Sequence, residues 1–309
     1  MGLAGQAGAA ISDSVDICIC TFRRASIVTT LESIARLDGM DGRAWRVIVA
    51  DNDETPTAEP VVRAAALRLG LPLEYRHAPA RNIAVARNAC LDAAGADWIA
   101  FIDDDETASP GWIRSLMAEA RRGGWDAVLG PSRAVYGPGA PRWMRQGDFH
   151  STRPVVLPDG IHAGYTTNVL VRRALIEQAG LRFDLQFGRT GGEDLDFFYR
   201  LRDAGGRIGF APDAWCEEPV PDSRARLGWL LARAFRNGQS HGTRLVRTHP
   251  SAPRRLVQGL IAAAKLAYCA AGAVIAALMP GRRYRFITRG ALHLGVIARI
   301  AGWREVNLY

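Results

Sequence analysis

Lysine is almost absent from this sequence. Of its 309 residues 39 are basic, and 38 of these are arginine, which leaves Lys265 as the single lysine. Several kinds of phosphate chemistry need a lysine to balance the charge of a phosphoryl group. Because Lys265 lies inside an apolar segment near the C-terminus, the sequence gives such chemistry little support.

Cysteine and histidine are also scarce, and neither residue type suggests a metal site. The five cysteines lie at scattered positions, and no spacing among them resembles a zinc site. The six histidines have no mutual ligand spacing either. We expect His150 and His162 to have core or surface roles, although both lie in loops where an acceptor could bind. The cysteines are expected to be free, buried thiols in a reducing cytoplasm.

Charge is divided unevenly along the chain. The formal net charge is +8, but residues 219–309 hold 15 basic and 2 acidic residues, a balance of +13. Residues 1–218 hold the other 24 basic and 29 acidic residues, a balance of −5. A body of net negative charge argues against binding to nucleic acid. Apolar residues at 48% and charged residues at 23% are typical of a folded protein.

Short apolar runs alternate with helical patterns in the first hundred residues. The runs at residues 15–20, 46–50, 73–76 and 98–102 are typical of buried strands. Their alternation with helices predicts an α/β fold with a parallel sheet that is covered on both faces. Polar clusters follow three of these strands, at residues 21–24, 51–53 and 103–105. Because ligands bind at the carboxyl ends of such strands, we expect a site there.

The regular alternation weakens after residue 126. Residues 131–163 are rich in proline and glycine, which predicts long loops over the site. Helices are expected near residues 172–179 and 193–204, and a last strand at residues 208–211. We therefore divide the chain into a disordered leader at residues 1–14, a folded body at residues 15–222 and a helical, basic region at residues 223–309. The leader has no apolar run of signal-peptide length.

Three consecutive carboxylates follow the fourth strand, in the sequence FIDDDET. Adjacent acids at a strand end repel one another unless a cation offsets their charge, and hard oxygen ligands suit Mg²⁺ or Mn²⁺. A solvated acidic turn is the structural alternative. Asp103, Asp105 and Thr107 also fit the nucleophile motif of the haloacid-dehalogenase phosphatases. That motif normally lies on the first strand and needs a downstream lysine, so it is disfavoured here.

A glycine-rich turn leads into a helix in the sequence GGEDLDFFYRLRDAGG. Glu193 and Asp194 fall in its first turn, where backbone N–H groups and the helix dipole favour carboxylates. Such a helix start can be purely structural. A flexible turn that presents a carboxylate near a metal site also suits a general base, which must meet an acceptor hydroxyl.

Five motifs in order resemble the inverting glycosyltransferases of family 2, which have the GT-A nucleotide-sugar-binding fold. The motifs are CTFRR, VIVADND, RNIAVARNACLDAAGADWIAFIDDDE, TTNVLVRRALIEQAGLRFD and GGEDLDFFYRLRDAGG, and the match as a whole covers residues 15 to about 218. Each motif alone is weak evidence, but five in the expected order are strong. The resemblance implies a Rossmann-like mixed sheet with helices on both faces, similar to bacterial enzymes that build exopolysaccharide or other surface glycans.

The resemblance also implies which residues bind the donor. Thr21, Phe22 and Arg24 match the loop that holds the nucleotide. Asp51 matches the acid that reads the base, and Arg87 matches a residue in contact with the nucleotide part of the donor. These five positions are therefore expected to line the donor site.

The acidic triplet and the helix start match the reactive part of the family's site. Asp103 and Asp105 match an Asp-x-Asp pair, in which one residue contacts the ribose side and the last binds the divalent metal. Asp104, between them, is a further candidate for contact with the donor. Asp194 matches the general base, and Glu193 precedes it as a supporting residue.

One part of the family pattern is missing. Many relatives place a histidine after the last strand of the body, as an additional metal or diphosphate contact. Here the stretch reads WCEEPVPDSR, so Glu217 or Glu218 could supply a carboxylate ligand, or the contact is absent. We favour Glu218, which would complete a metal site with Asp103 and Asp105.

The C-terminal region combines an apolar segment with arginines on both sides. Residues 256–279 are mostly apolar and are interrupted by Gln258 and Lys265. This length is borderline for a spanning helix, which needs about 20 predominantly apolar residues. Interfacial or re-entrant contact with anionic lipid is favoured over a soluble helical cap and over a true span. We therefore expect a cytoplasmic protein that is peripheral at the inner face of the cell membrane.

These features predict a metal-dependent, inverting hexosyltransferase with Mn²⁺ or Mg²⁺ as cofactor. The donor would be a nucleotide diphosphate sugar, with UDP favoured. The acceptor would be a hydroxyl of a glycan that is linked to a polyprenyl diphosphate in the membrane. The alternative is a non-catalytic partner that binds nucleotide sugar or glycan in a synthesis complex. The intact Asp-x-Asp and Glu-Asp motifs argue against that alternative.

Overall fold

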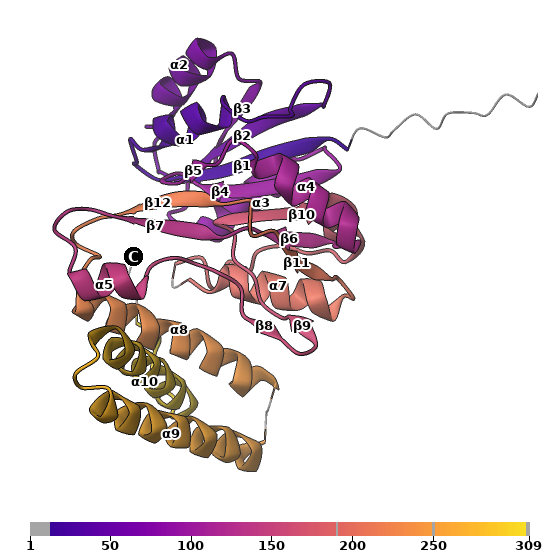
Figure 1. Ribbon diagram of the computed structural model, residues 1–309. Coiled ribbons are helices and arrows are strands. Elements are labelled where there is room, and N and C mark those ends of the chain that lie inside the picture. The colour runs from indigo at the N-terminus through magenta and orange to yellow at the C-terminus, as the bar shows by residue number, and fades with distance from the viewer. Residues whose placement is uncertain (1–12, 190, 249–250, 307–309) are drawn as a thin grey trace, which may run out of the picture.

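Strands and helices alternate through the body of the chain, and long helices follow it (Figure 1). The computed structural model describes residues 13–189, 191–248 and 251–306, so the predicted leader lies largely outside the described residues. The strands are β1 (Val15–Thr21), β2 (Trp45–Asp51), β3 (Leu73–His77), β4 (Trp98–Asp103), β5 (Thr107–Ala108), β6 (Ala127–Leu129), β7 (Ser132–Tyr136), β8 (Val156–Leu157), β9 (Gly160–Ile161), β10 (Asn168–Arg172), β11 (Ile208–Phe210) and β12 (Cys216–Val220). The helices are α1 (Ile27–Ile34), α2 (Glu59–Leu69), α3 (Ile83–Ala93), α4 (Trp112–Gly123), α5 (Arg142–Gly147), α6 (Arg173–Gln178), α7 (Glu193–Asp203), α8 (Leu227–Thr248), α9 (Ala252–Ile275) and α10 (Pro280–Ile300).

The central sheet has seven strands within the described ranges, in the order β11-β6-β10-β4-β1-β2-β3. β1 pairs in parallel with β2 and β4, and β2 pairs in parallel with β3, as the alternation predicts. β10, however, runs antiparallel to both β4 and β6. The expectation of a purely parallel sheet is therefore wrong on this side. The mixed sheet that the family resemblance implies is confirmed.

Two other expectations for the middle of the chain are also corrected. Only a helix is expected near residues 172–179, whereas the buried strand β10 precedes α6 there. The strand has only three consecutive apolar residues, Val169–Val171, and so short a run has too little periodicity to separate a strand from the start of a helix. The predicted long loops at residues 131–163 contain β7, α5 and the β8–β9 pair. β7 joins β5 and β12 in a second, three-stranded sheet.

Apolar side chains on both faces of the central sheet are covered by helices. In β1, Ile17 and Ile19 belong to one core cluster and Cys18 to the other, because alternate residues of a strand point to opposite faces. Leu31 of α1 lies in the first cluster, and Phe197 of α7 lies in the second. This two-sided cover confirms the predicted arrangement of helices.

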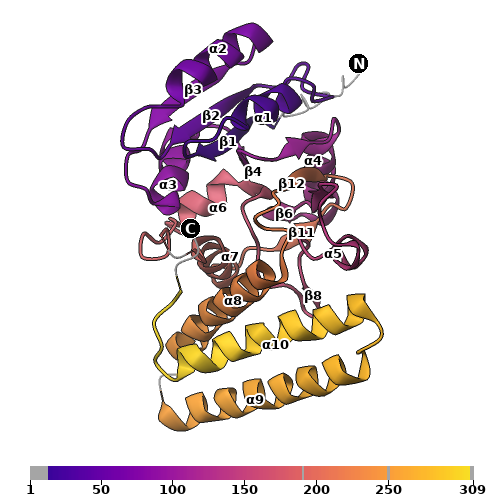
Figure 2. The ribbon, with the colours of Figure 1, turned by 90° about the vertical axis from the view of Figure 1, so that its left-hand side faces the viewer.

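The C-terminal helices α8, α9 and α10 lie together below the sheet body (Figure 2). α8 faces the body, and α9 lies on the far side of α10 in both views. Glycines let α8 and α10 approach backbone to backbone: a Cβ atom at Gly238 would collide with the Leu292 carbonyl, and one at Gly295 with the Phe235 carbonyl. Because the backbones are in contact, α8 and α10 hold a fixed mutual position.

We predict that Gly295→Ala lowers the free energy of unfolding by about 1–3 kcal/mol, because the added methyl group overpacks the α8–α10 contact. Gly281→Ala in the same helix is the matched control, since nothing lies within 4 Å of a Cβ atom at Gly281. That change should be neutral or raise the free energy of unfolding by up to about 1 kcal/mol. Urea denaturation of the full chain measures both. Equal stabilities of the two variants would contradict the close packing.

Candidate active site

The three polar clusters predicted at strand ends meet at one edge of the central sheet. Thr21 at the end of β1 pairs with Asp51 at the end of β2, and Cys20 pairs with Asp103 at the end of β4. Since β1, β2 and β4 are adjacent and parallel, the loops that follow them leave the sheet side by side. This edge is the candidate active site.

Asp104 joins the acidic triplet to the loop after β1. The Thr21 hydroxyl donates a 2.7 Å hydrogen bond to Asp104 Oδ2, and Arg24 Nη1 lies 3.3 Å from Asp104 Oδ1. Burial raises the pKa of Asp104 to about 6, although Arg24 and Thr21 favour its charged form. Phe22, in the same loop, is 40% exposed and lies open at the rim of the site. Asp104 thus fixes the loop rather than facing solvent.

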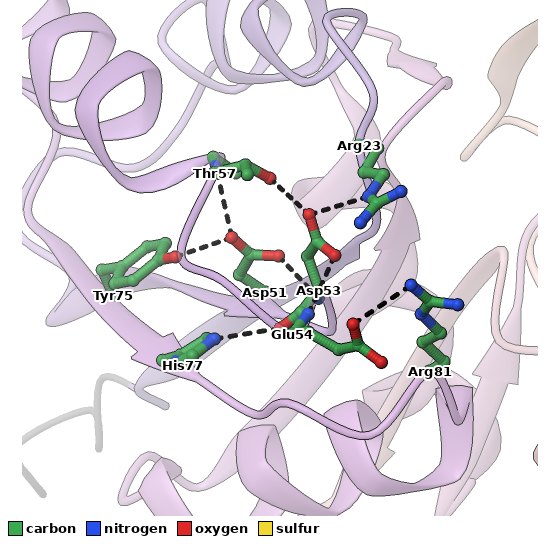
Figure 3. Close-up of polar contacts among 9 residues, drawn as sticks. Arg23, Asp51, Asp53, Glu54, Thr57, Tyr75, His77 and Arg81 are labelled. Carbon is green, nitrogen blue, oxygen red and sulfur yellow. Dashed lines mark hydrogen bonds and ion pairs between the residues drawn. The ribbon is translucent and has the colours of Figure 1, made fainter.

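Asp51 and Asp53 belong to a network that holds the loop after β2 (Figure 3). The fully buried carboxylate of Asp51 accepts hydrogen bonds from the Asp53 and Ala58 backbone N–H groups, each 3.0 Å, and from the Tyr75 hydroxyl at 2.7 Å. Arg23 Nε donates to Asp53 Oδ2 at 2.8 Å, which lowers the pKa of Asp53 to about 2. Asp51 therefore shapes the edge of the site. Its contact with the base of the nucleotide stays a prediction.

Arg87 links the triplet to α7. Its buried guanidinium forms an ion pair with the carboxylate of Glu193, and it lies 5.6 Å from the centroid of the Phe183 ring. Burial acts to lower the pKa of Arg87, but the carboxylates of Glu193 and Asp103 outweigh it and keep the arginine charged. Burial also raises the pKa of Asp103 to about 7, against the influence of Arg87. Arg87 is thus the buried positive charge between the acidic triplet and the start of α7.

Asp194 lies at the N-terminal end of α7, two residues after a pair of glycines with positive φ. Gly191 and Gly192 have φ values of +81° and +96°, a conformation that other residues rarely adopt. The Asp194 carboxylate accepts a 2.7 Å hydrogen bond from the Leu195 backbone N–H. Its position in the first helical turn stabilises a negative charge. The glycines therefore let the chain turn sharply and present Asp194 at the helix start while Glu193 points inward to Arg87.

Helix α8 lies along α7 and supports this turn. The guanidinium of Arg244 lies 3.3 Å from the centroid of the Tyr199 ring, and Arg247 lies 4.8 Å from that of Phe187. Arg236, buried on the same face of α8, packs against Gly191. Spacings of eight and three residues place these arginines on one side of the helix. The C-terminal region thus contacts the segment that carries Asp194.

Of the two glutamates that could replace the family histidine, the structure brings Glu218 to the triplet. Glu218 is largely buried on β12, and burial together with the charge of Asp105 raises its pKa. Arg224 Nη1 lies 3.4 Å from Glu218 Oε1, and Arg24 forms an ion pair with Asp105. Both carboxylates thus face an arginine.

The donor set at this edge fits a hard divalent cation in its chemistry. Asp103, Asp105 and Glu218 are all carboxylates, and they lie close enough for the charge of one to act on another. In the part of the chain that the structure describes, however, no three potential ligands already converge on one point. Asp105 is paired with Arg24 instead, and Glu218 with Arg224.

Glu106 is a site residue that the sequence analysis misses. It is fully buried beneath the triplet, accepts a hydrogen bond from the Ser132 hydroxyl and receives a 3.4 Å contact from the Asp103 backbone N–H. Burial and the nearby Asp103 carboxylate raise its pKa well above the usual range. The fourth acid of FIDDDET was the available signal. Glu106 ties the triplet to β7 and so to the second sheet.

Comparison with known proteins decides the family. Residues 16–180 match the model described as glycosyl transferase family 2. The chain is also 46% identical over 295 residues to the succinoglycan biosynthesis protein ExoM of Rhizobium meliloti (strain 1021), covering 96% of this chain and 95% of that protein. The chain belongs to glycosyl transferase family 2. The resemblance seen in the five motifs is thereby confirmed, and the chain is a glycosyltransferase.

Other relatives of this glycosyltransferase are more distant. It is 27% identical to the pre-mycofactocin glycosyltransferase of Mycobacterium tuberculosis (strain CDC 1551 / Oshkosh), over 78% of this chain but only 52% of that protein. A mannosyltransferase of Pyrobaculum calidifontis, solved in complex with GDP-Man and Mn²⁺, superposes with a TM-score of 0.64 at 20% identity over 95% of this chain and 88% of that one. S. aureus TarS 1-349 in complex with UDP-GlcNAc superposes with a TM-score of 0.55 at 17% identity, over 94% and 92% of the two chains. These solved structures establish the shared fold.

We predict that Arg87→Met in this glycosyltransferase costs about 3–5 kcal/mol of stability, because it leaves the buried Glu193 carboxylate without its ion-pair partner. Adding Glu193→Gln to the same variant should recover most of the loss. Arg81→Met is the matched control: its ion pair with Glu54 is about half exposed, so the change should cost less than about 1 kcal/mol. Urea denaturation measures all three, and equal losses for Arg87→Met and Arg81→Met would contradict the buried counter-charge.

Proposed function

We propose that the chain is an inverting, metal-dependent hexosyltransferase that uses a nucleotide diphosphate sugar, with UDP as the favoured nucleotide. The observation that carries the proposal is the placement of Asp194 at the start of α7, joined through Glu193 and Arg87 to the Asp103–Asp105 edge. Such a site has an acidic cluster on one side and a partly exposed carboxylate on the other.

The donor would bind at the carboxyl edge of β1, β2 and β4. Asp103, Asp105 and Glu218 are the residues that would hold Mn²⁺ or Mg²⁺, which stabilises negative charge on a leaving diphosphate. Phe22 is exposed at the rim and offers a flat ring for the nucleotide, with Arg24 beside it. Thr21 and Asp104 would hold that loop in place. Asp51 and Arg87, which are buried, would support the walls of the site.

Asp194 is the proposed general base. Its carboxylate takes the proton of the acceptor hydroxyl as the hydroxyl oxygen attacks the anomeric carbon and the bond to the nucleoside diphosphate breaks. A single in-line attack of this kind inverts the anomeric centre, so an α-linked donor gives a β-glycoside.

The similarity to ExoM supports a place in exopolysaccharide or other surface-glycan synthesis, because the alignment covers nearly the whole of both chains. The acceptor would be a hydroxyl of a lipid-linked glycan. A membrane-borne acceptor of this kind, carried on a polyprenyl diphosphate, is anionic and would suit the basic C-terminal region.

Asp194→Asn is expected to lower the transfer rate by about 10²–10⁴-fold, because the amide cannot accept the proton. Transfer of labelled hexose from a UDP-sugar with Mn²⁺ measures the rate, and calorimetry with UDP and Mn²⁺ should give an affinity within about twofold of the parent. Asp203→Asn, at the exposed far end of α7, is the matched control and should leave both values unchanged.

Unchanged transfer by Asp194→Asn would remove Asp194 as the base. A parent protein that binds UDP-sugars but transfers none of them would instead support the non-catalytic alternative. The two results are separated because the first measures a rate and the second compares the parent's binding with its turnover.

Helix α9 is the proposed contact with the membrane surface. It is long and apolar enough by length and composition to cross a membrane, but few of its residues are buried. Exposed apolar side chains near its C-terminal end include Ile275 at 86% and Leu278, just beyond it, at 96%. Arginines lie before and after the helix, which adds attraction to anionic lipid. We place α9 on the inner face of the cell membrane, lying at the interface.

Flotation with vesicles tests this contact. The full chain should float with vesicles that contain phosphatidylglycerol and should float less with pure phosphatidylcholine, and salt should weaken the association. Arg254→Glu with Arg255→Glu should reduce flotation several-fold, since each basic residue near the surface contributes about 1 kcal/mol. Arg63→Glu with Arg68→Glu on α2 is the matched control. The proposal fails if both double variants float as the parent does.

A further inference from the structure

Arg224 lies in the short link between β12 and α8, and its position is fixed on two sides. His150 Nε2 lies 3.1 Å from the Arg224 carbonyl oxygen, and the Arg224 guanidinium lies 5.7 Å from the centroid of the Trp229 ring. The rings of His150 and Trp229 are stacked, with centroids 5.2 Å apart. The Arg224 side chain is only 23% exposed. It is therefore a positioned group and not a loose surface arginine.

A second arginine shares this platform. The Arg233 guanidinium lies 5.3 Å from the Trp229 centroid, and its positive charge, like that of Arg224 and Arg24, acts on Glu218. Three arginines from the β1 loop, the link and α8 thus act on the Glu218 carboxylate, and one of them, Arg24, also pairs with Asp105. Held together, these cations would repel one another unless anions stood among them.

The ion pair of Arg224 with Glu218 is weak enough to exchange. The N–O distance is 3.4 Å, longer than the 2.7–2.9 Å of a strong charge-assisted contact. Arginine offers a planar fork of donors that matches phosphate oxygens in a bidentate way. A diphosphate that arrived at this edge could therefore take Arg224 from Glu218 and leave that carboxylate for a cation.

We propose that Arg224 has two successive partners: Glu218 in the free protein, and the diphosphate of the nucleotide donor in the complex. In the first state it keeps a metal-binding carboxylate neutralised, and in the second it binds the phosphate oxygens while Glu218 turns to the cation. Arg24 forms a shorter ion pair with Asp105 in the same cluster, and the exchange is proposed for Arg224 alone. This inference rests on the proposed function, because it assumes a nucleoside diphosphate at the site.

The exchange has a consequence that a simple phosphate-binding role lacks. Because Arg224 competes with the cation for Glu218, its removal should make binding of Mn²⁺ alone tighter. The same removal should make binding of UDP with Mn²⁺ weaker, because two charge-assisted hydrogen bonds are lost. The two affinities therefore change in opposite directions.

Calorimetry on the full chain tests this. Arg224→Met should bind Mn²⁺ alone roughly two- to fivefold more tightly. It should bind UDP at saturating Mn²⁺ roughly ten- to a hundredfold more weakly. Arg224→Lys keeps the charge without the fork, so Mn²⁺ binding should stay near that of the parent while UDP binding still weakens. Arg226→Met, on an exposed neighbour in the same link, is the matched control and should change neither value.

Other outcomes of the same experiment distinguish failure of the proposed exchange from failure of the proposed function. If both affinities of Arg224→Met fall together, or neither changes, the exchange is wrong although the donor site stands. If the parent itself binds no UDP with Mn²⁺, the proposed function fails and the inference with it. Binding of geranyl diphosphate is measured in parallel, as a probe for a lipid diphosphate. If Arg224→Met loses affinity for geranyl diphosphate but not for UDP, Arg224 binds a lipid diphosphate, and its proposed contact with the nucleotide donor is wrong. Thermal unfolding confirms that each variant is folded.

Discussion

Carboxylates that are withdrawn from water repel one another, and this chain gathers several of them at the edge where β1, β2 and β4 end. Asp103, Asp104 and Glu106 all have raised pKa values because they are buried close together. The counter-charges come from arginines on separate elements, and Arg87 and Arg24 are the most direct of them. Keeping these charges in place requires that the loop after β1, helix α3 and helix α7 pack around the same edge.

The rest of the architecture follows from that requirement. Glu106 draws in Ser132 of β7, and β7 pairs with β12, which carries Glu218. The link after β12 then supplies Arg224 and leads directly into α8. α8 in turn lies along α7 and is held against α10 by glycine contacts. The basic C-terminal region therefore contacts the site at two points, through Arg224 in the link and through the side of α8 that lies along α7.

Much of this was predictable because it depends on neighbours in sequence. The first four strands, the helices between them and the polar clusters at their ends follow from apolar periodicity and from abrupt changes to polar residues. The GGED helix start is equally local, since glycines with positive φ and acids in the first turn need no distant partner. The features that the sequence analysis missed are the antiparallel strand β10 and the second sheet. Both depend on pairing with strands that are distant in sequence, and short apolar runs do not reveal which strand is the partner.

The sequence by itself determined the family, the order of the elements and the set of acids and arginines available to the site. Only the tertiary structure decided how those charges pair. Asp104 is turned to the loop after β1, Glu193 to Arg87 and Glu218 to Arg224, while Asp194 stays partly open to solvent. These pairings depend on burial and distance between elements that lie up to 106 positions apart. The energy of a charge is set by its surroundings in space, and a one-dimensional pattern does not contain those surroundings.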